Sequence, residues 1–506
     1  MSDAPRVVDS GRSPADRILE CVGSFAHDFV TALVDAEIHA PESPLHKAHL
    51  TSAARALRDA IATGAEAPVT LRFAGGRVLW QEHDLVAASL QAARLLRIAA
   101  ERGVAALAFD ARTDGKALVA LVELLRDERA RDAWRPQTIE MVLRARGVRG
   151  VTVTLGQPAT AAAEPGAAGV SPQGAVRELS FADAIAGYQA LTDTLQDNHV
   201  RATRGREIEI DVTRGVVERA VATMNTAPSD LLALAVYDDI DRFTVGHSVR
   251  VALLALQVAR AAGANEPQLL LVGTAGMLHD IGKGLVPQDV LFKQGRLDDD
   301  EWRVMAEHPR LGAELLLEQK DVHPAAIGAA YCHHMAPGGL GYPRPFVPFD
   351  TSGISKLVRV CDVFEALTAV RPYKRDLAPL EALVVMHREA QGFDPHWFRF
   401  FVQTIGVYPI GTRVLLSTGE RALVVRQGIA VDRPVVRVIE SRQAGDLPGA
   451  DARELTIGDR IGEVSVAVDA VVRRRTGAAG EDPTTQVSAA VRHSCLGGEP
   501  GAPGRD

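Results

Sequence analysis

Potential metal ligands recur on helix-like segments between residues 235 and 400, and this series constrains the chain more than any other feature. At its centre is the dipeptide His279–Asp280 in MLHDIGK, where an adjacent imidazole and carboxylate can bind the same or neighbouring divalent ions. The other members of the series are His247, His308, His333, His334 and Asp362. Nitrogen and oxygen ligands in this number suit a centre of two metal ions.

Helical periodicity places two of these side chains among apolar residues. His247 shares a helix face with Val251 and Val258. Asp362 similarly precedes Ala366 by one turn, and a buried aspartate is costly unless it is paired or bound to a metal. A single histidine in such a position is more often an ordinary core or surface residue. The complete set in this order favours metal ligands.

The length and charge of the chain bound its organisation and its partners. A chain of 506 residues is too long for one core, so about three modules are expected. The formal charge of -8 creates no general attraction for nucleic acid or for an anionic membrane surface. A polyphosphate ligand would therefore need a local basic site.

Cysteine spacing and hydropathy indicate the cellular compartment. The four cysteines are Cys21, Cys332, Cys361 and Cys495. They are far apart and show neither a disulfide framework nor a zinc-binding spacing, which favours a reducing cytoplasm. Apolar runs are too short to cross a bilayer, and the first residues lack the apolar core of a signal peptide. We therefore expect a cytoplasmic protein without a membrane span.

The N-terminal part, residues 1–155, mixes helical and strand-like patterns. Helices are predicted at 13–40, 45–64, 84–101, 117–128 and 137–146, and strands at 69–73, 77–80, 105–109 and 151–155. The first two strands flank a Gly-rich turn and should form a hairpin. This alternation predicts an α/β or α+β module. It contains no recognisable catalytic motif, so we interpret it as a regulatory or dimerisation module.

Composition changes divide the rest of the chain. The predicted parts are an Ala/Pro/Gly-rich linker at 156–176, a helical catalytic domain at 177–404, a small β-rich appendage at 405–474 and a disordered tail at 475–506. The expected fold class is therefore mainly α, with an α/β or α+β module before the catalytic domain and β structure after it.

The motifs of the helical domain resemble the HD-GYP family. The similarity covers about Asp241 to Phe401 and includes, in the family's order, MLHDIGKGLVPQDVLFKQGRLDDDEWRVMAEHPRLG, the HH pair, GLGYP and VCDVFEALTAVRPYK. The resemblance implies a helical fold around two or three metal ions, usually iron or manganese, that hydrolyses cyclic di-GMP to linear pGpG, to GMP or to both. Trinuclear members carry a Glu where this chain has Phe243, so the resemblance favours two ions.

Transferred by position, the ligands implied by the resemblance are His247, His279, Asp280, His308, His333, His334 and Asp362. Two ions can bridge a water and lower its pKa, which would provide a hydroxide for attack on phosphorus. The resemblance suggests that Asp280 bridges the ions, and Asp280 could also accept the proton. Lys283, one turn beyond His279, could stabilise charge on a phosphate oxygen.

Two further segments are candidates for substrate binding. Arg371 and Lys374 in RPYK match family positions that bind phosphate, although they could also be a solvated surface pair. Gly341, Tyr342 and Pro343 resemble the GYP signature, although they could also form only a structural turn. In some members this loop is thought to contact diguanylate cyclase (GGDEF) domains. A homodimer is compatible with the interpretation of the N-terminal module.

The sequence departs from the family at two positions near the HH pair. Met335 and Gly338 stand where the family usually has carboxylates, although neither position belongs to the implied ligand set. Because residues around a metal site tune its activity, two alternatives stay open. The domain could be a catalytically weak nucleotide-binding signalling module, or it could hydrolyse another nucleotide.

Overall fold

The computed structural model separates into two compact units, Gly11–Asp193 and a unit that contains the chain from Thr194 onward. The described residues are 14–38, 44–156, 181–226, 245–293, 295–347, 349–369, 377–441, 445–446, 453–458, 460–461 and 464–471. The division falls inside one helix, α7 (Phe181–Thr203). The predicted linker lies outside the described residues except for Gly156, and the predicted disordered tail lies wholly outside them.

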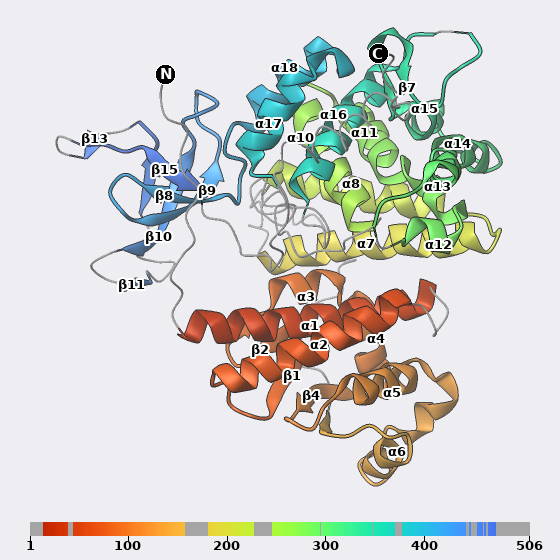
Figure 1. Cartoon of the computed structure of the whole chain (residues 1–506), viewed down its shortest axis with the longest axis vertical. Coiled ribbons are helices and arrows are strands. Elements are labelled where there is room, and N and C mark those ends of the chain that lie inside the picture. The colour runs from red at the N-terminus through yellow and green to blue at the C-terminus, as the bar shows by residue number, and fades with distance from the viewer. Residues whose placement is uncertain are drawn as a thin grey trace, which may run out of the picture. The chain divides into compact units, whose positions relative to one another are not determined.

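The N-terminal unit packs two long helices against an antiparallel sheet. Helices α1 (Pro14–Ile38) and α2 (Pro44–Thr63) lie side by side, as Figure 1 shows in red and orange. Phe25 of α1 is fully buried, and its ring centroid lies 4.8 Å from that of Phe109 in the sheet. Aromatic packing thus joins the helix layer to the sheet in one core.

A glycine turn connects the first two strands of the sheet in this unit. Strands β1 (Val69–Ala74) and β2 (Arg77–Trp80) form the predicted hairpin, and Gly75 and Gly76 adopt φ of 57° and 72°. Two positive φ angles suit a tight hairpin turn, which explains the two glycines. The strand order is β3-β2-β1-β4-β5, and each neighbouring pair is antiparallel. The unit is therefore α+β.

The remaining elements of this unit are β3 (His83–Asp84), α3 (Val86–Gln91), α4 (Ala93–Glu101), β4 (Val104–Phe109), α5 (Gly115–Arg126), η1 (Glu128–Ala133), α6 (Ile139–Ala145) and β5 (Val151–Leu155). The single helix predicted at 84–101 is wrong in detail, because the structure has two helices that meet at Ala92. The other predicted helices and strands of this unit are confirmed within a few residues.

The second unit is mainly helical in its first two thirds. After α7, its elements are α8 (Ile210–Thr226), α10 (Val245–Ala261), α11 (Glu266–Leu278), η2 (Ile281–Leu285), α12 (Gln288–Leu291), α13 (Asp299–Met305), α14 (His308–Leu317), α15 (Pro324–Cys332), β6 (Met335–Ala336), η3 (Pro337–Gly339), β7 (Leu340–Gly341), α16 (Gly353–Thr368), α17 (Pro379–Arg388), η4 (Ala390–Gly392) and α18 (Pro395–Ile405). Helices α10, α11 and α16 pack on one another, and α15 packs against α11 and α16.

Small residues allow these helices to approach closely. A Cβ on Gly276 of α11 would lie 2.7 Å from Cα of Ala252 in α10, so the two backbones nearly touch. The start of α11 is marked by a capping box in which the side chains of Asn265 and Gln268 bind each other's backbone N–H. α10 is buried on almost all sides, which makes it a core helix rather than a surface helix with one apolar face.

Short strands follow α18 and form a separate small core. They are β8 (Arg413–Leu416), β9 (Arg421–Arg426), β10 (Val435–Ser441), β11 (Gly445–Asp446), β12 (Glu454–Thr456), β13 (Arg460–Ile461), β14 (Val464–Ser465) and β15 (Val468–Val471). In the antiparallel sheet with the order β11-β10-β9-β8-β15, Val414, Val424 and Val436 are fully buried, whereas β13 and β14 pair separately. The predicted fold class is thus confirmed. No helix in the described part of the chain has the length and apolar character needed to cross a membrane.

Candidate metal centre

Helix ends bring most of the predicted ligands together. His279 and Asp280 follow α11, His308 begins α14, and His333 and His334 follow α15. His247 and Asp362 instead project from within α10 and α16. All seven side chains are described, and each is at most 7% exposed. The structure therefore collects every predicted ligand in the interior of the second unit.

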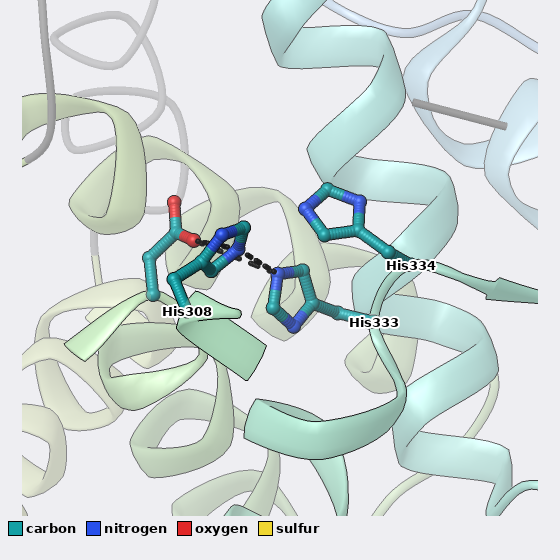
Figure 2. A group of neighbouring side chains, drawn as sticks. His308, His333 and His334 are labelled. Atoms are coloured by element: carbon teal, nitrogen blue, oxygen red, sulfur yellow. Dashed lines mark hydrogen bonds and ion pairs between the residues drawn. The ribbon is translucent and has the colours of Figure 1, made fainter. Parts of the chain in front are cut away.

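Asp280, His308, His333 and His334 form one group of potential donors, whose ligand atoms all lie within 4.8 Å of one another. The Nε2 atoms of His308 and His333 are 3.2 Å apart, and they lie 3.2 and 3.5 Å from Oδ1 of Asp280. Figure 2 shows the three histidine rings converging from neighbouring segments. This arrangement can surround a single ion.

His247, His279 and Asp280 form a second such group. Oδ2 of Asp280 lies 3.5 Å from Nε2 of His247 and 3.4 Å from Nε2 of His279. The two groups therefore share Asp280, with one carboxylate oxygen directed to each. Oδ1 of Asp362 lies 3.0 Å from Nε2 of His247, and its Oδ2 lies 3.8 Å from Nδ1 of His334. Asp362 thus reaches one member of each group.

Main-chain carbonyls orient three of the imidazole rings. Nδ1 of His279 lies 2.7 Å from the carbonyl oxygen of Gly276, and Nδ1 of His308 lies 2.8 Å from that of Met305. Nδ1 of His333 is likewise 2.9 Å from the Ala330 oxygen. Each Nδ1 must carry a proton to donate it to a carbonyl, so in the neutral ring Nε2 is an acceptor.

The acceptors therefore face one another across the site. The Nε2 lone pairs of His308 and His333 are directed at each other and at the Asp280 carboxylate. Nε2 of His279 and Nδ1 of His334 are buried and make no hydrogen bond with the described residues. Buried polar atoms are nearly always satisfied, and converging acceptors require a cation. The residues present thus fit a bound metal ion.

The protonation states of Asp280, His333 and His334 agree with this chemistry. Burial alone would raise the pKa of Asp280, but Lys283 and the neighbouring imidazoles hold it well below its usual range. Burial lowers the pKa of His333 to about 4 and also lowers that of His334. An ionised carboxylate and neutral imidazoles are the forms that bind metals.

His247 contacts a buried ion pair that was not predicted from the sequence motifs. Glu365 of α16 binds Nδ1 of His247 through Oε2, and Nε of Arg250 donates to Oε1 of Glu365 over 2.5 Å. Burial by itself would lower the pKa of His247, but the carboxylates of Glu365 and Asp362 raise it to about 9. Their spacing in the sequence could have indicated these two residues, because Arg250 and Glu365 each follow a predicted ligand by three residues.

Arg359, which was also not predicted from the sequence, donates a hydrogen bond to the backbone of His333. Arg359 of α16 is 2% exposed, and its guanidinium donates to the carbonyl oxygens of Gly392, at 2.8 Å, and of His333, at 3.3 Å. The guanidinium also lies over the Phe393 ring, 5.7 Å from its centroid. A buried arginine thus fixes the backbone of a predicted ligand. Its sequence context, an apolar helix, gave no specific signal.

The predicted substrate-binding loop contacts the metal-site residues. Gly341 has φ of 89°, and a Cβ there would lie 2.1 Å from the carbonyl oxygen of His334. Next to it, the Tyr342 ring stacks on the His334 ring with centroids 4.5 Å apart. Pro343 follows in the same half-buried loop. These contacts place the loop beside the candidate centre, and its substrate binding remains a prediction.

Other predicted residues have different outcomes. Nζ of Lys283 lies 2.5 Å from Oδ2 of Asp280, so in this structure it pairs with a candidate ligand. Arg371, Lys374 and Phe243 lie outside the described residues. Met335, where the family usually has a carboxylate, is buried in β6.

Residues 233–397 match the family model described as HD domain. These residues form an HD domain. It contains all seven predicted ligands, which confirms the expected HD-type resemblance. The matched segment ends before the C-terminal strands, so the candidate centre lies wholly within the HD domain.

Curated relatives of the HD domain act on cyclic dinucleotides, as their names state. The chain is 34% identical to "Cyclic di-GMP phosphodiesterase PA4108" of Pseudomonas aeruginosa, over 48% of this chain and 59% of that protein. It is 37% identical to "Cyclic di-GMP phosphodiesterase response regulator RpfG" of Xanthomonas campestris, over 29% and 39% of the two chains. It is 31% identical to "3'3'-cGAMP-specific phosphodiesterase 3" of Vibrio cholerae, over 33% and 36%. The chain thus spans 59% or less of these relatives.

Proposed function

We propose that the HD domain is a metal-dependent phosphodiesterase that hydrolyses cyclic di-GMP. The observation that carries this proposal is the buried Asp280 carboxylate, which faces one histidine group with each oxygen. A shared carboxylate between two donor groups suits two neighbouring ions. The relatives named as cyclic di-GMP phosphodiesterases support the choice of substrate.

The proposed ligands divide between two ions. His247, His279 and Asp280 would hold one ion, while the other would be held by the group that contains His308. Asp362 is proposed as a further ligand because its oxygens face both groups. Imidazole and carboxylate donors suit iron or manganese. When bound, such ions supply positive charge at a phosphodiester and lower the pKa of water.

Residues around the centre would bind and orient the substrate. Lys283 is a cation next to Asp280 and can place positive charge near a phosphate oxygen in the transition state. Tyr342 flanks His334, and a ring in this place can stack on a purine base. Arg371 and Lys374 are proposed to bind the second phosphate, since a cyclic dinucleotide carries two. The product is proposed to be linear pGpG, GMP or both.

Two specific observations keep alternatives in view. The Vibrio cholerae relative is named for 3'3'-cGAMP, which favours another cyclic dinucleotide as a second candidate substrate. Met335 and Gly338 remove two carboxylates that the family usually has, which favours a weak nucleotide-binding module. For the N-terminal unit we propose a regulatory or dimerising role. A GGDEF domain remains a proposed partner.

The test combines metal analysis with hydrolysis under anaerobic conditions. Protein loaded with iron or manganese is incubated with cyclic di-GMP and, separately, with 3'3'-cGAMP. Asp280→Asn removes the shared charge at nearly constant volume, and Asp299→Asn is the matched control on the exposed first turn of α13. We expect about two ions per chain and turnover that only Asp280→Asn abolishes. Metal-loaded protein that leaves cyclic di-GMP intact would refute the proposal.

A further inference from the structure

Two charged residues and two predicted ligands pair across helices α10 and α16. His247 and Arg250 lie three residues apart on α10, and Asp362 and Glu365 have the same spacing on α16. Nε2 of His247 faces Asp362, while its Nδ1 contacts Glu365. Each helix thus presents two residues from one face to the other helix.

Glu365 and Arg250, the two charged residues of this pairing, are both buried. Glu365 is 3% exposed and Arg250 is 8% exposed, so neither charge is well hydrated. A buried carboxylate without a cationic partner is strongly unfavourable. The Arg250 guanidinium engages Oε1 of Glu365, and Oε2 is then directed at the imidazole of His247.

The contact with Glu365 distinguishes His247 from three other predicted ligands. His279, His308 and His333 direct Nδ1 to neutral carbonyl oxygens, whereas His247 directs Nδ1 to a carboxylate. An Nδ1–H bound to a carboxylate fixes the ring tautomer and increases the donor strength of Nε2. Among the described residues, His247 is one of three members of its donor group, so a change in its orientation removes a large share of the ligands there.

We propose that Glu365, held in place by Arg250, is a positioning residue that presents Nε2 of His247 to the ion of the His247, His279 and Asp280 group. This inference rests on the proposed function only in taking His247 as a metal ligand. Glu365 itself belongs to neither donor group, because its Oε2 lies on the Nδ1 side of the ring. Its role is therefore to act through His247.

The competing interpretation is a purely structural ion pair between two helices. Removing Glu365 would then lower stability without changing either ion. A positioning residue, in contrast, should weaken chiefly the ion that His247 would hold, since Glu365 contacts the His247 ring and belongs to neither donor group. The two interpretations thus predict different metal titrations.

The experiment compares the full-length wild type with Glu365→Ala and Glu365→Gln. Gln can still accept a hydrogen bond from Nδ1 but carries no charge, so it preserves orientation better and guards against a failure of the Ala variant to fold. Val424→Ala, a truncation of a fully buried side chain in the β9 strand, is the control for a general loss of stability. Metal-free proteins are titrated anaerobically with Co²⁺, whose visible absorption reports its ligands, in the presence of a competing chelator.

We expect two binding phases in the wild type and in Val424→Ala. In Glu365→Ala one phase should weaken by about 10-fold to 100-fold with a changed Co²⁺ spectrum, and Glu365→Gln should lie between. Two unchanged phases in both Glu365 variants, with only reduced thermal stability, would overturn the inference and establish a structural ion pair. Two phases in a wild type that does not hydrolyse cyclic di-GMP would instead refute the proposed function and leave this inference standing.

Discussion

Lys283 lies against Asp280, with 2.5 Å between its Nζ and Oδ2 of the carboxylate. The lysine side chain is 19% exposed and the aspartate side chain only 1%, so the pair joins the buried centre to its rim. Because Asp280 is the carboxylate that both histidine groups share, the same lysine can offset negative charge in the centre and contact a substrate phosphate.

Replacing Lys283 by Met should therefore reduce turnover more than metal binding. We expect Lys283→Met to lower kcat for cyclic di-GMP by about 100-fold, as for the loss of one donor to a charged transition state. Lys293→Met, which removes a lysine paired with Glu301, is the matched control and should leave kcat unchanged. Steady-state kinetics with metal analysis checks both, and an unaltered kcat in Lys283→Met would remove this residue from the mechanism.

Gly341 and Gly338 allow a matched test of the loop. Both have positive φ, 89° and 76°, so a Cβ at either costs about 1–2 kcal/mol of strain. At Gly338 the added methyl meets nothing within 4 Å, whereas at Gly341 it would lie 2.1 Å from the His334 carbonyl oxygen. Urea unfolding should therefore show a greater loss of stability for Gly341→Ala. Only this variant should also lose metal, and equal effects would contradict the close contact.

Gly282 tests how closely η2 must approach α14. A Cβ there would lie 2.0 Å from the carbonyl oxygen of His308 and 2.5 Å from the backbone nitrogen of Gly312. Gly282→Ala should cost at least about 1–3 kcal/mol, because backbone on both sides has to move. Gly328→Ala within α15 has room and should be neutral or stabilising by about 1 kcal/mol. Calorimetry distinguishes the two, and a stable Gly282→Ala protein would be the contrary result.

Metal binding should become tighter as the pH rises from 7 to 9. Although burial opposes it, the carboxylates of Glu365 and Asp362 raise the pKa of His247 to about 9, so this ring is protonated in the metal-free protein at pH 7. A ligand must lose that proton, and His247 thus contributes about a tenfold gain in affinity per pH unit below pH 9. Chelator competition with Mn²⁺ without oxygen measures the slope. His247→Ala should show a shallower slope, and identical slopes would exclude the linkage.

The same shift gives the metal-free protein a pH-dependent stability. Because the folded pKa of His247 lies above its ordinary value of 6.5, its contribution is complete below pH 6.5 and is lost as the pH rises through about 9. Denaturation of metal-free protein should therefore show falling stability over this window. His247→Ala should show a smaller fall, and a slope equal to that of the wild type would assign the effect to other groups.

Local patterns in the sequence were sufficient for much of this protein. The glycine turn at Gly75–Gly76 and the alternating residues around it predicted the hairpin, since both signals lie within a few residues. The seven predicted ligands were recognisable from their motifs, and all of them are gathered in one buried centre. The same local reasoning missed the break at Ala92, where apolar spacing alone does not reveal a helix end.

Relationships between distant segments were decided only by the tertiary structure. The pairing of Glu365 with His247 spans 118 residues and depends on the register of α10 against α16, which side-chain packing sets. The contact of Arg359 with the His333 carbonyl and the division of the histidines into two groups around Asp280 have the same origin. The sequence by itself therefore determined which side chains could bind metal. The packing of the helices determined which of them lie together in one donor group and which residues hold them in place.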